Sequence, residues 1–177
     1  MDSTELRTLA DRCAAITWLV LDVDGVLTDG GIVYSSGGLE LKQFHVRDGA
    51  GLKLWHRAGK RSAVITGRDS PIVAVRAAEL GITSVFQGVG EKLSTLRHLE
   101  ADVGIQSETI CYVGDDWPDL SSLRHCGLAV ATADACAEVR AAAHYITRNP
   151  GGHGAVRETI ELILHAQGVW QRLVDQL

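Results

Sequence analysis

Two aspartates, Asp22 and Asp24, follow an apolar run and are the first residues in the sequence that suggest chemistry. The run from Leu19 to Leu21 has the composition of a strand buried on both faces, and residues two apart on a strand point to the same side. Two carboxylates in such a place are costly unless a cation lies between them. Gly25 follows at once and lets the backbone approach a ligand closely. The pattern predicts a site for a metal ion and a phosphate.

Polar residues also follow the later apolar runs, in the position that Asp22 takes after the first: Thr66, Lys92, Asp115 and Asp116. Open α/β sheets bind ligands at the carboxyl ends of their strands, so we expect these side chains to meet in one crevice. Each residue alone would indicate only a helix cap or a solvated surface group. Their shared position makes a common site the better interpretation.

These residue types suit metal-assisted chemistry on a phosphate. Mg²⁺ prefers oxygen ligands and takes one or two carboxylates together with phosphate and water. Asp22 and Asp115 can supply the carboxylates, and Asp24 can add its backbone carbonyl. Asp116 and Asp119 are placed to hold metal-bound water or to orient the ligands. We therefore expect a Mg²⁺ cofactor.

The same set contains the groups that phosphoryl transfer needs. A carboxylate beside a metal can attack phosphorus and form an aspartyl-phosphate. A second carboxylate two residues along the strand can protonate the leaving alkoxide and later deprotonate water. Thr66 and Lys92 can donate hydrogen bonds to the phosphoryl oxygens.

Strands that alternate with helices over the whole length predict a doubly wound, mostly parallel, Rossmann-like α/β sheet in one domain, residues 1–177. The expected strands lie at 19–21, 61–66, 84–87, 110–113, 128–130 and 145–147. The expected helices lie at 3–14, 48–58, 71–80 and 91–101, between Asp119 and the strand at 128–130, at 134–143 and from 155 onward. Turn residues between two β-prone runs predict a hairpin at about 30–44, a flap or an assembly surface outside the main sheet. The tail 169–177 either continues the last helix or lies across a neighbouring subunit.

Composition excludes several classes of protein. The chain has 177 residues, 46% hydrophobic, a net charge of −5 and a pI near 5.8, which argues against binding to nucleic acid or to an anionic membrane. It shows neither a signal peptide nor an apolar stretch of the roughly 18–20 residues that span a bilayer, so we expect a soluble, cytoplasmic protein. The four cysteines have no CxxC spacing and indicate buried thiols rather than disulfides or a zinc site.

Four segments resemble, in order and spacing, the four motifs of the haloacid dehalogenase superfamily of phosphohydrolases: Asp22-Val-Asp-Gly-Val-Leu-Thr28, Thr66-Gly-Arg68, Lys92 and Gly114-Asp-Asp-Trp-Pro-Asp119. The resemblance implies that Asp22 is the nucleophile and Asp24 the acid/base. It also implies that Thr66 and Lys92 hold the phosphoryl group, and that Mg²⁺ binds Asp22, Asp24 and Asp115. No insertion large enough for a cap domain separates these motifs.

The segments 24–30, 44–49, 66–68 and 151–158 are similar to a capless family of sugar-acid phosphatases within that superfamily. The similarity implies action on 3-deoxy-D-manno-octulosonate 8-phosphate in lipopolysaccharide precursor synthesis. The similarity implies a homotetramer in which hairpins assemble and a neighbouring subunit helps to close each site. An anionic sugar-acid phosphate needs cationic donors, and the matching segments supply Arg47, Arg68, His153 and Arg157, with Gly25 and Gly67 beside them. For Arg157, an ion pair with Glu161 on the same helix is an equal alternative.

Three other functions remain open. A related phosphatase for a 2-keto-3-deoxynonulosonate or N-acylneuraminate 9-phosphate would tend to carry an acid after Thr66-Gly67, so Arg68 favours the octulosonate. A receiver-type signalling domain would carry its acceptor aspartate on the third strand, where this chain offers only Gln87-Gly-Val-Gly90. A non-catalytic regulatory module would keep the fold without turnover.

Overall fold

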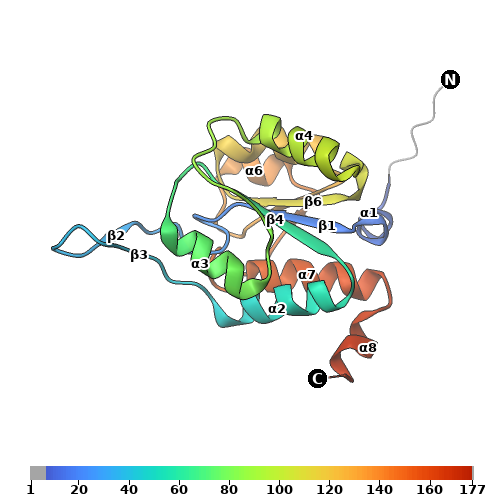
Figure 1. The fold of residues 1–177 in the computed structure, drawn as a ribbon. Helices are drawn as coiled ribbons and strands as arrows, with labels where there is room; N and C mark the ends of the chain where they lie inside the picture. The colour runs from blue at the N-terminus through green and yellow to red at the C-terminus, as the bar shows by residue number, and fades with distance from the viewer. Residues whose placement is uncertain (1–6, 177) are drawn as a thin grey trace.

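The computed structural model describes residues 7–176, and its centre is a six-stranded parallel sheet in the order β5-β4-β1-β6-β7-β8 (Figure 1). The strands are β1 (Trp18–Leu21), β4 (Arg61–Ile65), β5 (Ser84–Phe86), β6 (Ile110–Gly114), β7 (Leu128–Ala131) and β8 (Tyr145–Ile146). All six correspond to strands expected from the sequence. The predicted Rossmann-like α/β fold is confirmed, and β1 lies between β4 and β6 at the centre of the sheet.

Helices cover both faces of this sheet (Figure 1). One face carries α1 (Leu9–Ala15), α2 (Val46–Arg57), α3 (Pro71–Leu80), α7 (Ala155–Ala166) and α8 (Trp170–Val174); the other carries α4 (Lys92–Val103), α5 (Leu120–His125) and α6 (Ala137–Ala142). Alternate residues of β1 serve the two layers, since Leu19 and Leu21 pack on the first face and Trp18 and Val20 on the second. Burial on both sides explains why the strand reads as a continuous apolar run.

The hairpin expected at 30–44 is present as β2 (Val33–Tyr34) paired antiparallel with β3 (Glu40–Leu41). It projects from the body of the molecule at one edge (Figure 1). Its outward side chains are apolar and exposed, with Leu39 71% and Leu41 55% accessible. Hydrophobic patches of this kind mark sites of contact between molecules.

Most boundaries differ from the expected ones by a few residues at each end, and three differences have an identifiable reason. The first helix begins at Leu9, with Thr8 as its cap, while residues 3–6 of the expected helix lie outside the described part of the chain. Helix α6 begins at Ala137 rather than at Asp134, because the Asp134 carboxylate accepts a hydrogen bond from the Gly151 backbone and is used by another loop. The tail does not continue α7, since Gly168 adopts a φ of +67° and α8 follows as a separate helix.

Within residues 7–176, we find no helix that is both long enough and apolar enough to cross a membrane. All four cysteines are free thiols; Cys13, Cys111 and Cys126 are buried as predicted, whereas Cys136 is partly exposed.

Candidate functional site

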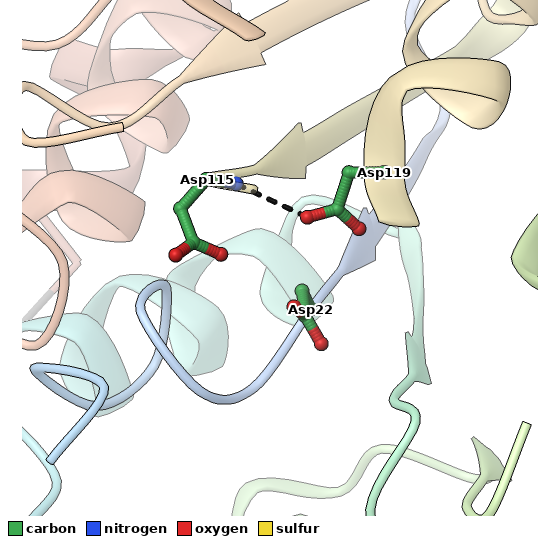
Figure 2. A group of neighbouring side chains, drawn as sticks. All are labelled: Asp22, Asp115 and Asp119. Atoms are coloured by element: carbon green, nitrogen blue, oxygen red, sulfur yellow. Dashed lines mark hydrogen bonds between the residues drawn. The ribbon is translucent and has the colours of Figure 1, made fainter. Parts of the chain in front are cut away.

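Three carboxylates meet beyond the carboxyl ends of β1 and β6. Asp22 follows β1 directly, while Asp115 and Asp119 belong to the loop after β6. The register pairs Leu21 with Val113, so the residues that follow the two strands emerge at the same level. One oxygen of each carboxylate lies within 4.8 Å of the others, and Figure 2 shows the three side chains around a common space. The arrangement can hold one metal ion.

The electrostatics of this cluster fit a hard cation. Burial, reinforced by the negative charges of Asp22 and Asp119, raises the pKa of Asp115 to about 8. Burial likewise raises the pKa of Asp22 to about 6, with Asp119 adding to the effect. Within residues 7–176, Asp115 Oδ1 is buried and has no hydrogen-bond partner. An unpartnered oxygen among like charges is a ligand atom suited to Mg²⁺.

Two glycines leave room for this cluster. Gly25 has a φ of +87°, and a Cβ there would lie 2.0 Å from Asp115 Oδ2. Gly151 packs on the same turn, because a Cβ added to it would lie 1.9 Å from the Gly25 carbonyl oxygen. A larger residue at Gly25 would displace the Asp115 carboxylate, and one at Gly151 would displace the turn that carries Asp24.

Lys92 lies in the first turn of α4 with its ammonium between two carboxylates. Its Nζ is 2.8 Å from Asp22 Oδ2 and 2.8 Å from Asp119 Oδ1. Burial alone would lower the pKa of Lys92, but these two carboxylates outweigh it and raise the pKa. Lys92 therefore carries its positive charge beside the carboxylate oxygen of Asp22.

Asp119 is fully buried, and both of its oxygens accept hydrogen bonds. Oδ1 accepts from Lys92 and from the Tyr112 hydroxyl at 2.8 Å, and Oδ2 accepts from the Asp115 backbone at 3.1 Å. These contacts fix Lys92 and the loop after β6, in keeping with the orienting role expected for Asp119. Asp116 is exposed at the rim of the same loop.

Thr66 stands at the end of β4, next to β1. Its backbone N–H donates to the Phe86 carbonyl at 2.9 Å, so β5 fixes its position. The side chain is buried, but in the described residues its hydroxyl makes no hydrogen bond. A fixed, unengaged hydroxyl suits the predicted contact with a phosphoryl oxygen, and the exposed backbone of Gly67 follows it.

Asp24 is held by cations from two directions. Lys42, at the end of the hairpin, forms an ion pair with Asp24 Oδ1, and Arg68 Nε lies 3.5 Å from Oδ2. The Arg68 side chain also donates to Glu40 at 2.8 Å. Sequence reasoning singled out Arg68 but assigned no role to Lys42 or Glu40. The alternation Leu39-Glu40-Leu41-Lys42 was the signal that both charges share one side of the hairpin.

The other cations expected to bind substrate lie elsewhere. Arg47, His153 and Arg157 line one cavity of about 540 Å³, and neither Asp24 nor the cluster of Asp22, Asp115 and Asp119 lines it. Arg157 Nε also pairs with Glu161 at 2.6 Å, which is the alternative raised by their spacing. The structure thus brings Arg68 to Asp24 and gathers the remaining three in an adjoining pocket.

Comparison with known proteins gives a consistent result. The family of haloacid dehalogenase-like hydrolases matches residues 62–158. A 3-deoxy-D-manno-octulosonate 8-phosphate phosphatase of Haemophilus influenzae is 44% identical over 86% of this chain and 85% of its own length. The corresponding phosphatase of Escherichia coli K12 is 46% identical, covering 86% of this chain and 81% of its own.

A solved structure shares the fold closely. It is the 3-deoxy-D-manno-octulosonate 8-phosphate phosphatase of Moraxella catarrhalis, in complex with magnesium, phosphate and KDO. It superposes with a TM-score of 0.93 at 42% identity and covers 94% of this chain and 96% of its own.

Proposed function

Since this chain belongs to the haloacid dehalogenase-like hydrolases and is a phosphomonoester hydrolase, we propose that Asp22 and Asp24 carry its chemistry on 3-deoxy-D-manno-octulosonate 8-phosphate. The observation that carries this assignment is the cluster of Asp22, Asp115 and Asp119, with its unpartnered oxygen and the buried Lys92. This cluster provides both a metal site and a cation for phosphate at one point.

The reaction begins with attack by an Asp22 oxygen on phosphorus. When bound, Mg²⁺ supplies positive charge that keeps Asp22 and Asp115 ionised and polarises a phosphoryl oxygen. Lys92 and the Thr66 hydroxyl donate to the other phosphoryl oxygens, whose charge grows in the transition state. The phosphorus–oxygen bond to the sugar breaks, and Asp22 becomes an aspartyl-phosphate.

Asp24 moves the proton in both halves of the reaction. It donates a proton to the departing sugar oxygen and then, as a carboxylate, takes one from water. The activated water attacks phosphorus and breaks the bond to Asp22, which frees inorganic phosphate and restores the enzyme. Asp24 lies at the opening of the turn, 19% exposed, where both leaving group and water have access.

Arg68 supports the choice of an anionic sugar acid. Its Nε is a buried donor without a hydrogen-bond partner in the described part of the chain, and it faces Asp24, where the leaving sugar must lie. A guanidinium there suits the hydroxyls and carboxylate of a sugar acid. Arg47, His153 and Arg157 would act only on substrate that extends into their pocket.

A panel of sugar phosphates compared by kcat/KM with Mg²⁺ tests the substrate. We expect the octulosonate 8-phosphate to exceed 2-keto-3-deoxynonulosonate and N-acylneuraminate 9-phosphates by about tenfold or more. A preference for a 9-phosphate would transfer the assignment to the nonulosonate phosphatases. Absence of phosphate release from every substrate would indicate a non-catalytic module.

We also propose that the chain works as a homotetramer assembled through its hairpins. The exposed residues Ile32, Val33, Leu39 and Leu41 support this, because a two-stranded hairpin is marginally stable alone and these side chains gain from burial against copies of themselves. Light scattering measures the mass directly, and a fully active monomer would contradict the proposal.

We infer that the chain forms a single phosphatase domain over residues 1–177. The packing of α7 on α2 supports this inference, because it brings distant parts of the chain together.

We infer a cytoplasmic location. It is supported by the four free cysteines, three of them buried, which suit a reducing compartment. Fractionation of the native host tests the location.

A further inference from the structure

The second arm of the hairpin turns its charged side chains inward. Leu39 and Leu41 are 71% and 55% exposed, whereas the side chains of Glu40 and Lys42 are only 16% and 2% exposed. Alternate residues of a strand face opposite sides, so this arm has an apolar outer face and a charged inner face. The inner face contacts the turn after β1 and the loop after β4.

Lys42 and Arg68 approach different oxygens of Asp24. Oδ1 is paired with the Lys42 ammonium and lies 3.5 Å from the Thr28 hydroxyl. Oδ2 accepts no hydrogen bond from any residue between 7 and 176, and Arg68 Nε stands 3.5 Å away. Lys42 therefore holds one oxygen, whereas the other lies beside Arg68, accepts no hydrogen bond within residues 7–176 and can exchange a proton with the leaving group.

Glu40 holds the cations that approach Asp24. Its Oε1 accepts from Arg68 at 2.8 Å and lies 3.5 Å from Lys42 Nζ. Its Oε2 accepts from the Ser70 hydroxyl at 2.6 Å, which ties the hairpin to the start of α3. The Ser70 hydrogen bond, together with Arg68, lowers the pKa of Glu40 to about 2. Glu40 thus remains a carboxylate at any working pH.

A buried lysine is poorly explained by stability alone. Burying an ammonium costs solvation that even its two ion pairs, with Asp24 and Glu40, barely offset, and an apolar side chain of similar length is often as stable. Lys42 contacts Asp24, the carboxylate that must present an oxygen first to the leaving sugar and then to water. Its position is better explained by orientation of that carboxylate.

We propose that Lys42, held by Glu40, is a positioning residue that fixes the Asp24 carboxylate for proton transfer. This inference rests on the proposed role of Asp24. It gives the hairpin a second task besides assembly, because the hairpin completes the catalytic site of its own chain. Removal of Lys42 leaves Asp22, Lys92 and the metal carboxylates untouched, so the proton step alone is weakened.

The test compares two leaving groups in Lys42→Met. A sugar alkoxide needs a proton from Asp24 as it departs, whereas p-nitrophenolate leaves without one. We expect kcat/KM for the sugar-acid phosphate to fall about 10- to 100-fold, within the range of general acid catalysis, and that for p-nitrophenyl phosphate by less than about threefold. The loss for the sugar phosphate falls on kcat, and Lys42→Arg recovers part of it.

Matched variants complete the test. Lys53→Met removes an exposed lysine from α2 and should leave both substrates unchanged. Glu40→Gln keeps Lys42 but loosens it, so we expect the same selective loss at a smaller size; it also serves if Lys42→Met does not fold. Circular dichroism and light scattering establish that each variant keeps its fold and mass.

Three results would overturn the proposal: an equal loss with both substrates, a loss confined to KM, or no loss at all. The first assigns Lys42 to the phosphoryl group, the second to substrate binding, and the third to neither. A wild-type protein that cleaves neither phosphate would instead refute the proposed function, so the two failures are distinct.

Discussion

The apolar strands β1 and β6 end in carboxylates that are buried, as for Asp22 and Asp119, or partly buried, as for Asp115. In the second arm of the hairpin the pattern is the opposite, since Leu39 and Leu41 are exposed and the charged side chains of Glu40 and Lys42 are covered. The strand ends are fixed by parallel pairing on both sides of β1. The hairpin has only one short antiparallel pair of its own. One region is rigid within the chain, and the other depends on what it contacts.

This difference separates two tasks. The cluster of Asp22, Asp115, Asp119 and Lys92 contains what attack on a phosphate requires, whatever alcohol leaves. Of the residues assigned to the reaction, the hairpin contacts Asp24 and Arg68, which lie on the side of the leaving group. We therefore assign the phosphoryl chemistry to the strand ends, and proton transfer and substrate choice to the hairpin together with the loop after β4.

Asp22→Asn should abolish the chemistry of the strand-end site and leave assembly through the hairpin unchanged. The amide cannot attack phosphorus, so we expect kcat/KM to fall by at least about 10³-fold, as for other nucleophile replacements. Mass by light scattering should not change. Asp102→Asn, on the exposed side of α4, is the matched control and should keep full activity. Mg²⁺-dependent phosphate release that persists in Asp22→Asn would remove the nucleophile assignment.

The double variant Val33→Glu with Leu39→Glu should disrupt assembly through the hairpin and leave the strand-end site intact. Eight added charges in a tetramer, two on each hairpin, oppose assembly, and we expect a monomer whose kcat/KM is reduced about 10- to 100-fold by lost positioning. Binding of Mg²⁺, measured by calorimetry, should remain close to wild type because the strand ends are intact. Val75→Glu changes an exposed apolar residue on α3 and serves as control. A monomeric variant with full turnover would contradict the proposed dependence of activity on assembly.

Much of the strand-end region could be predicted from the sequence, for a physical reason. Buried parallel strands need continuous apolar runs, so polar residues such as Asp22, Thr66 and Asp115 stand out where each run ends. The order of these residues follows the order of the strands, and the sheet then brings them to one edge. For these residues, the local sequence pattern and the position in the folded sheet therefore indicate the same site.

The hairpin could be located but not interpreted in the same way. The alternation over residues 39–42 indicates that Glu40 and Lys42 share one side of the hairpin, but not what that side contacts, so both resemble solvated charges until the fold places Asp24 beside them. The same holds for Asp48, expected at the start of α2: it is buried and accepts hydrogen bonds from Gly154 and Arg157 at the start of α7. Such long-range contacts have no signature in the local sequence.

The pH dependence of the Mg²⁺ effect on stability provides the finest test, because that effect acts through the strand-end carboxylates. The folded pKa of Asp115 is raised to about 8 and that of Asp22 to about 6, against ordinary values near 3.8, so in the metal-free protein these two groups bind more protons in the folded than in the unfolded state between about pH 4 and pH 8. Their contribution to stability must then fall as pH rises from about 4 to about 8. Mg²⁺ binds the ionised carboxylates and opposes that fall.

We expect the rise in Tm on adding Mg²⁺ to be larger at pH 8 than at pH 5.5 by about 3–6 °C, corresponding to 1–2 kcal/mol in a chain of this size. Calorimetry of protein stripped with EDTA measures both shifts. Asp115→Asn should abolish most of the difference, since it removes the carboxylate with the higher pKa. The hairpin double variant should retain the difference in full, because its substitutions lie outside the cluster. An equal Mg²⁺ effect at both pH values, or its loss in the hairpin variant, would show that the strand ends and the hairpin are one coupled unit.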